Sequence, residues 1–391
     1  VVTPSADRQI KNVTDLAHRV ESAWHDGLRQ LGVRTLPEHT LGGDLPGRLA
    51  YAAVWMVKRR KDGPTRLARH LPVAVLVAPM PEGQGLAAVR GWDDSTGEWV
   101  PYARFLLGLV KQAEIDPDAF AVPEAPEGIL TAGAPRLTAK QRRADLTQQR
   151  QETAAFLQRV LHSLRGQPTL VLTHAQNSRL HWPGLQDGHV ERDLVRVGHA
   201  PAGRLDDELR LVRVRGGGGR ECAQWWGLSD PGSPHGQPAG FWRQSPVRDG
   251  GRVFYSTTER PGSFPVSPSL DRLATRVTAA GNLTSQSGKP AWNPTLMEIV
   301  VLGCHDGDSV AAAMGQAPDD AEAIALAVHQ LRQSPDYNAD LSLPLPLHLA
   351  GLAQEYVLPT PADAEPPREA GTEAAAPEDE AAQLTLFQNV E

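Results

Sequence analysis

The chain has 391 residues, of which 40% are hydrophobic and 22% charged, a balance typical of a globular protein. This composition excludes a wholly disordered or fibrous chain, and no run approaches the roughly 18 uninterrupted apolar residues of a membrane span. The two cysteines, Cys222 and Cys304, cannot form a disulfide framework, so a reducing, cytoplasmic location is expected. The first residue is Val rather than Met, which suggests the C-terminal part of a longer protein.

The net charge of −7 is carried by the end of the chain. Residues 357–391 contain eight acidic side chains and one basic side chain, Arg368, whereas the preceding residues contain 38 of each sign. The body is therefore neutral and can still gather basic side chains into a groove. The Pro, Ala and Glu of the tail cannot bury enough apolar surface to order it, so it is expected to be disordered.

In the first third of the chain, apolar spacing predicts an amphipathic helix over residues 7–31 and a second helical stretch over residues 49–63. The apolar run of residues 71–78 predicts a buried strand of a mixed or parallel sheet. Residues 85–92 and 97–110 predict two strands paired around the turn DDSTG, and the second strand passes into a helix.

The rest of the chain alternates strands with helices. The predicted elements are a long helix over residues 138–164, strands in TLVLTH, ELRLVRVR, VFYST and MEIVVLG, a capped helix over residues 319–333, and a last helix after the prolines of SLPLPLHLAGLAQEYV. This order of elements predicts a layered α/β fold.

Several of these segments together resemble a known family. The segments, in order, are ETAAFLQRVLHSL, TLVLTHAQNSR, ELRLVRVRGGGGREC, NPTLMEIVVLGCHDGDS and LPLPLHLAGLAQEYVLP. They are similar to the PIWI domain of Argonaute proteins, which has an RNase H-like fold. The most similar branch is prokaryotic pPIWI-RE, named for an arginine and a glutamate. The resemblance implies an N-terminal helical segment at the end of a MID-like region (1–69), an RNase H-like PIWI domain (70–356) and a tail (357–391).

The resemblance also implies a function and partners. A PIWI domain of this branch is expected to bind guide and target nucleic acid in bacterial, antiviral-type defence against invading DNA. Its expected partners are a helicase and a restriction-type nuclease, with no membrane association. The arginine of the family name would be Arg179 or Arg215, and the glutamate Glu298 or Glu221.

The same resemblance gives a test for nuclease activity. An RNase H site holds two divalent ions with clustered carboxylates. The expected positions of these acids in this chain are Ala78 or Pro79 at the end of the first strand, His174 after the long helix, and Gly351 in the last helix. All three acids are missing from these positions, so a domain that binds without cutting and needs no metal is predicted.

Two alternatives to that prediction stay open. An active Mg²⁺- or Mn²⁺-dependent nuclease would need acids from predicted loops: Asp93, Asp94, Asp187 or Asp306. A non-catalytic scaffold would bind proteins instead of nucleic acid.

Polar side chains at strand ends are candidates for binding phosphate. Gln176, Asn177 and Arg179 leave a strand just before Trp182, and their alternative is a side-chain-stabilised turn with the tryptophan in the core. Further candidates are Arg213, Arg215 and Arg220, of which the last follows four glycines that also suit a plain flexible loop.

Glu298 lies in an otherwise apolar strand. A carboxylate there is costly unless it is paired, so an arginine partner is expected. The alternative is an edge strand on which Glu298 faces water.

Two basic clusters and a terminal motif complete the candidates. The two basic clusters are Lys58, Arg59, Arg60 and Lys140, Arg142, Arg143. Each cluster either contacts the phosphates of a nucleic acid or is a plain solvated face of the protein. In the tail, Gln383, Leu384, Leu386 and Phe387 resemble the peptide by which bacterial proteins dock into the β sliding clamp, unless this segment folds back onto its own domain.

Overall fold

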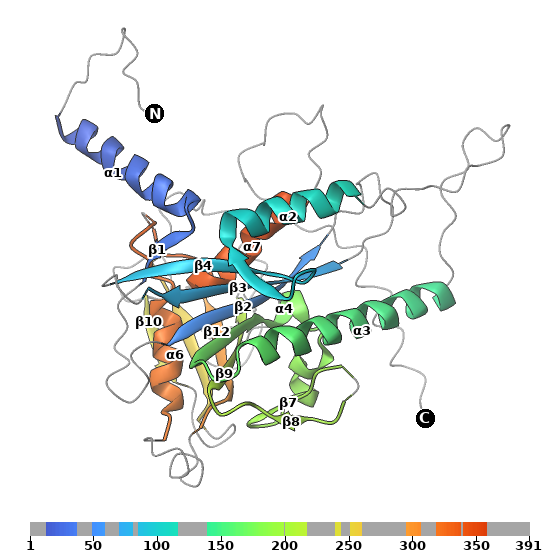
Figure 1. Cartoon of the computed structure of the whole chain (residues 1–391). Helices are drawn as coiled ribbons and strands as arrows, with labels where there is room; N and C mark the ends of the chain where they lie inside the picture. The colour runs from blue at the N-terminus through green and yellow to red at the C-terminus, as the bar shows by residue number, and fades with distance from the viewer. Residues whose placement is uncertain are drawn as a thin grey trace, which may run out of the picture. The chain divides into compact units, whose positions relative to one another are not determined.

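The computed structural model describes the following residues: 13–36, 49–58, 70–80, 85–115, 139–198, 200–216, 239–243, 251–259, 295–305, 318–337 and 339–357. The chain divides into two compact units, Val1–Leu358 and Pro359–Glu391, and every described residue belongs to the first. The centre of this first unit is a large mixed sheet (Figure 1).

The sheet has ten strands in the order β1-β4-β3-β2-β6-β9-β12-β11-β10, with β5 paired to β4. The strands are β1 (Val33–Thr35), β2 (Ala50–Lys58), β3 (His70–Pro79), β4 (Leu86–Asp93), β5 (Glu98–Pro101), β6 (Thr169–His174), β9 (Leu209–Gly216), β10 (Gly240–Arg243), β11 (Val253–Thr257) and β12 (Met297–Gly303). β6 is parallel to both of its neighbours, β2 and β9, and the other pairs in the sheet are antiparallel.

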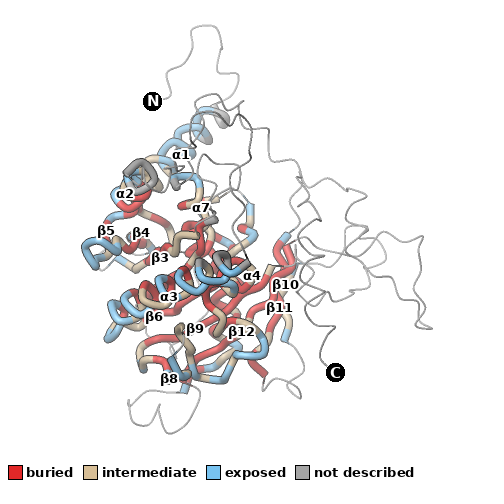
Figure 2. Tube along the Cα trace, turned by 90° about the vertical axis from the view of Figure 1, so that its right-hand side faces the viewer, coloured by how far each residue is buried: buried red, intermediate tan, exposed pale blue. Residues whose placement is uncertain are grey.

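Helices cover both faces of the sheet. α2 (Tyr102–Ile115), α6 (Ala321–Gln330) and α7 (Leu345–Val357) pack on one face, where their side chains share a core with the odd-numbered residues of β2. The long helix α3 (Ala139–Ser163) packs on the other face (Figure 1). Figure 2 shows the strands buried between these layers, with the exposed residues mainly on the helices and connecting segments. We refer to the two faces as the α7 face and the α3 face.

β2 corrects one prediction. Residues 49–63 were predicted to be helical, but Ala50–Lys58 form a central strand. The reason is that β2 is covered on both faces, so nearly every residue in it is apolar and buried. Such a run shows neither the alternation of a half-exposed strand nor the period of an amphipathic helix, and alanines made a helix the easier interpretation.

Most other predicted elements are confirmed. The helix expected at residues 7–31 is present as α1 (Val13–Gln30), and the long helix as α3. The predicted cap of α6 is present, because the side chain of Asp320 accepts a hydrogen bond from the backbone N–H of Glu322. α7 begins at Leu345, between the two prolines of its sequence. The predicted layered α/β fold, a mixed sheet flanked by helices, is therefore confirmed.

Four short strands were not predicted. These are β1, β10, and the separate two-stranded pair β7 (Leu194–Val195) and β8 (Gly203–Arg204). Each has two to four residues, too few for an alternating pattern. Among the described helices, none is both long and apolar enough to cross a membrane.

Candidate functional site

Three positions far apart in the sequence meet on the α7 face, where β2 and β6 run side by side. The parallel register pairs Val54 with Thr173, so the next residues, Trp55 and His174, are neighbours, with their ring centroids 5.4 Å apart. α7 passes over them at Gly351, where a Cβ atom would lie 3.8 Å from the Trp55 indole. All three residues are half-buried, so this cluster is accessible from the surface.

The resemblance implies carboxylates at two of these three positions. His174 and Gly351 were predicted for two of the three acid positions, and the structure brings them to either side of Trp55. The third predicted position, Ala78, does not join them. It lies on β3, pairs with Ala88 and packs against the core on the α3 face.

The misassignment of Ala78 follows from the misread strand. The resemblance puts the first acid at the end of the first strand, and the first long strand of the sheet is β2 rather than β3. In the cluster, Trp55 of β2 thus stands beside His174, where Ala78 of β3 was expected.

The cluster does not fit a pair of divalent ions. Trp55 and Gly351 offer no side-chain oxygen, and the Nδ1 atom of His174 accepts a hydrogen bond from the backbone N–H of Asn177 at 3.2 Å. Mg²⁺ and Mn²⁺ sites are built mainly from oxygen ligands. Within the described part of the chain, no group of three or more His, Cys, Asp or Glu side chains is placed to hold a metal.

The acids considered for an active nuclease are placed elsewhere. Asp93 accepts hydrogen bonds from the backbone N–H and hydroxyl of Ser95, and Asp94 pairs with Arg159. Asp187 pairs with two arginines, and Asp306 lies outside the described residues.

Two amide side chains hold the ends of the neighbouring strands. After β6 ends, the chain forms the short helix α4 (Ala175–Ser178), in which Gln176 bonds both the N–H and the C=O of Gly216 on β9. Asn177 does the same for Met56 on β2, at 2.6 and 2.8 Å. Both amides thus continue the hydrogen bonding of β6 to its two neighbours, through contacts between strands rather than within a local turn.

The residues that follow α4 agree with the predicted alternative of a tryptophan in the core. Trp182 is 1% exposed, and its indole N–H donates to the backbone oxygen of Arg196. Arg179 is half-buried at the end of α4. Neither Asn177 nor Trp182 is available to a phosphate.

A cluster of four charges lies at the same end of the sheet but on the α3 face. Arg215 and Glu298 are directly paired across β9 and β12, with Nε and Oε1 3.4 Å apart. Arg213 Nη2 lies 3.6 Å from the same glutamate oxygen. Asp187, in the 3₁₀ turn Asp187–His189, accepts hydrogen bonds from both arginines. We call these four residues the arginine–carboxylate cluster.

The cluster confirms the expected arginine partner of Glu298. β12 lies between β9 and β11, and Glu298 is 8% exposed, so the alternative of a water-facing edge strand is wrong. Burial raises the pKa of Glu298, although Arg215 and Arg213 act in the opposite direction. Partial burial would also raise the pKa of Asp187, but the hydrogen bonds from Arg213 and Arg215 outweigh it and leave that pKa lowered.

The remaining predicted binding residues are scattered or lie outside the description. Lys140 and Arg143 are exposed at the start of α3, and β2 ends at Lys58. Outside the described residues lie Arg59, Arg60, Arg220, Glu221, Gln383, Leu384, Leu386 and Phe387, and the side chains of Lys58 and Arg142 are not described.

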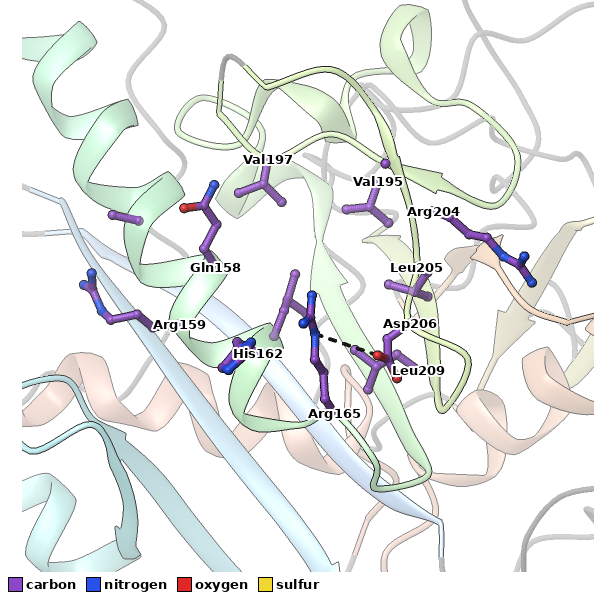
Figure 3. Close-up of a pocket in the computed structure, with 13 residues that line it drawn as sticks. Gln158, Arg159, His162, Arg165, Val195, Val197, Arg204, Leu205, Asp206 and Leu209 are labelled. Carbon is purple, nitrogen blue, oxygen red and sulfur yellow. Dashed lines mark ion pairs between the residues drawn. The ribbon is translucent and has the colours of Figure 1, made fainter. Parts of the chain in front are cut away.

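A second concave region lies on the α3 face. It is a cavity of about 510 Å³ between α3 and the segment that carries β7 and β8, and its apolar lining includes Val195, Val197 and Leu205 (Figure 3). Its lining combines apolar side chains with three arginines, Arg159, Arg165 and Arg204, and one acid, Asp206. Arg165 pairs with Asp206 at 3.7 Å, so the lining carries more basic than acidic side chains.

Sequence reasoning missed two residues of these sites. Trp55 would have followed from reading residues 50–58 as a strand beside TLVLTH. Asp187 was considered only as a metal ligand, and nothing in its local sequence indicates two arginines some 26 to 28 positions away as its partners.

Comparison with known families agrees with this geometry. Residues 51–359 match the RNaseH domain of pPIWI_RE, a span that begins within β2 and contains the candidate site. Residues 1–39, which include α1 and β1, match the MID domain of pPIWI_RE. No curated protein matches the chain significantly. Since the first of these models covers most of the sequence, the chain belongs to the pPIWI-RE family of PIWI-like, RNase H-fold proteins.

Proposed function

We propose that this chain is a catalytically degenerate PIWI domain that binds guide and target nucleic acid without cutting it. The observation that carries the proposal is that His174 and Gly351, the positions at which the resemblance implies two of the carboxylates, meet at Trp55 in a cluster without any carboxylate. The indole N–H of Trp55 is buried without a hydrogen-bond acceptor among the described residues.

The first experiment measures binding and cleavage together. Labelled single-stranded and duplex DNA and RNA are incubated with the protein in Mn²⁺ or in chelator, at two salt concentrations. The expected result is binding that weakens steeply with salt in both buffers, because phosphate contacts release counterions, and no cleavage in either. Mn²⁺-dependent cleavage contradicts the proposal, and an absence of binding in every buffer favours a protein scaffold.

A pair of tryptophan variants locates the binding surface. Trp55→Leu is expected to weaken oligonucleotide binding about tenfold, since contact with one base is worth about 1–3 kcal/mol. Trp24→Leu is the control, because Trp24 is 70% exposed on α1, away from the candidate site. Equal effects of both changes would place binding elsewhere.

The family also supports proposals about the cellular role. We propose that the protein acts in the bacterial cytoplasm, in defence against invading DNA, beside a helicase and a restriction-type nuclease. The motif of Gln383, Leu384, Leu386 and Phe387 supports docking to the sliding clamp. Purified clamp is expected to bind the full chain and to lose most of this binding to the variant L386A/F387A. Undiminished binding by that variant would exclude the motif as the contact.

A further inference from the structure

The arginine–carboxylate cluster has two unlike sides. On the inner side, Glu298 is fixed within the sheet, and its distances to the arginines, 3.4 and 3.6 Å, are those of ion pairs. On the outer side, Arg213 Nη1 and Arg215 Nη2 donate to one and the same oxygen, Asp187 Oδ1, at 2.6 and 2.5 Å. Both arginines therefore donate to a single oxygen of the outer carboxylate, at distances typical of charge-assisted hydrogen bonds or shorter.

The burial of these side chains differs sharply. The side chains of Arg213 and Arg215 are only 5% and 11% exposed, whereas that of Asp187 is 67% exposed. Asp187 is the first residue of the three-residue turn Asp187–His189, and a Cβ atom added at its middle residue, Gly188, would meet nothing within 4 Å. A solvent-facing carboxylate on an uncrowded turn thus covers a buried pair of guanidinium groups.

Moving Asp187 away would leave a site that attracts anions. The two arginines and Glu298 would then carry one net positive charge, and the two guanidinium groups would lose their shared carboxylate oxygen, although Arg213 Nη1 would keep its hydrogen bond to the backbone oxygen of Leu185 at 2.8 Å. Arg213 Nε is buried and already has no acceptor among the described residues. Two guanidinium groups that converge on one point match the several oxygens of a phosphate.

We propose that Arg213 and Arg215 form a phosphate-binding site that Asp187 occupies as a competing anion of the protein itself. This inference rests on the proposed function in one respect: the phosphate that displaces Asp187 would belong to a nucleic-acid backbone. Because Asp187 competes for the site, the apparent affinity for phosphate equals the intrinsic affinity multiplied by the fraction of time for which Asp187 leaves the site open.

The test compares the effect on phosphate binding of removing the charge of Asp187 with the effect of removing the charge of another aspartate. Inorganic phosphate is titrated into the full chain at constant ionic strength and pH, and binding is measured by calorimetry and by the shift in melting temperature. Asp187→Asn keeps the shape of the side chain and removes its charge. It is expected to bind phosphate about tenfold tighter than the wild type, which corresponds to a site that Asp187 leaves open about one tenth of the time.

Asp207→Asn is the matched control. Asp207 pairs with Arg204 at 3.4 Å, and both side chains are 56% exposed, so its loss changes the net charge equally without opening a buried arginine pair. D207N is expected to bind phosphate like the wild type. Adding Arg215→Gln to D187N is expected to abolish the gain. Circular dichroism checks folding, and Asp187→Ser replaces the Asn variant if that variant does not fold.

Several outcomes would overturn the inference. These are equal phosphate affinity of D187N and the wild type, an equal gain in D207N, and a gain that survives Arg215→Gln. An oligonucleotide titration of the same variants separates this inference from the proposed function. A gain for inorganic phosphate without any oligonucleotide binding would leave the anion site standing and remove nucleic acid as its ligand.

Discussion

Replacement of Asp319 by alanine is expected to lower the free energy of unfolding by about 3–5 kcal/mol. Asp319 forms a two-pronged ion pair with Arg210 of β9, at 2.9 and 3.0 Å, and both side chains are 2% exposed. Asp319 also accepts a hydrogen bond from the backbone N–H of His305. The substitution leaves the buried guanidinium of Arg210 without its counter-charge. The decrease in the free energy of unfolding is measured by urea denaturation.

Asp94→Ala is the control for this prediction. Asp94 and Arg159 form an ion pair of the same two-pronged geometry, at 2.8 and 2.7 Å, but their side chains are 40% and 47% exposed. Solvent screens this pair, so its loss is expected to cost less than about 1 kcal/mol. Similar losses in the two variants would show that burial does not set the cost. The double change R210M/D319L is expected to recover most of the stability.

Asn177→Ala is expected to cost about 3 kcal/mol, measured in the same way. Its amide is the partner of both backbone groups of Met56, a residue only 1% exposed, so the variant leaves a buried N–H and a buried C=O unsatisfied. The end of β2 next to Trp55 would loosen, and oligonucleotide binding is expected to weaken as well.

Gln176→Ala removes the same kind of amide–backbone hydrogen bonds from a more solvent-exposed position. Gln176 bonds both backbone groups of Gly216, but Gly216 is half-buried and water can replace the lost amide. A cost of about 1 kcal/mol is expected. If Q176A proved as damaging as N177A, the explanation by burial of the backbone groups would be wrong.

Much of the fold could be predicted because its patterns are local. The long helix α3, the strand and helix of β5 and α2, and the cap of α6 each follow from periodicity or from a capping residue within the segment. β2 could not be predicted in this way, since a strand buried on both faces carries no period. That residues 50–58 form a strand follows only from their pairing with β3 and β6, and no pattern within residues 50–58 records that pairing.

In the candidate site, too, residues within a recognisable segment could be predicted, and residues that depend on tertiary contacts could not. His174 and Gly351 were found because each follows a recognisable segment, and both stand in the cluster. Trp55 was missed together with its strand. The pairing of Arg215 with Glu298 was anticipated from the cost of a lone carboxylate in an apolar strand, whereas the role of Asp187 depends on a tertiary contact that no local pattern records.

Under the proposed function, the indole of Trp55 bears on any attempt to build a metal site into this cluster. Its ring centroid lies 5.4 Å from that of His174, and a Cβ atom added at Gly351 would lie 3.8 Å from the indole. Carboxylates installed at positions 174 and 351 alone would therefore adjoin a bulky aromatic ring. A design that aims at metal binding there must first replace Trp55 on β2 by a smaller residue, and only then supply oxygen donors.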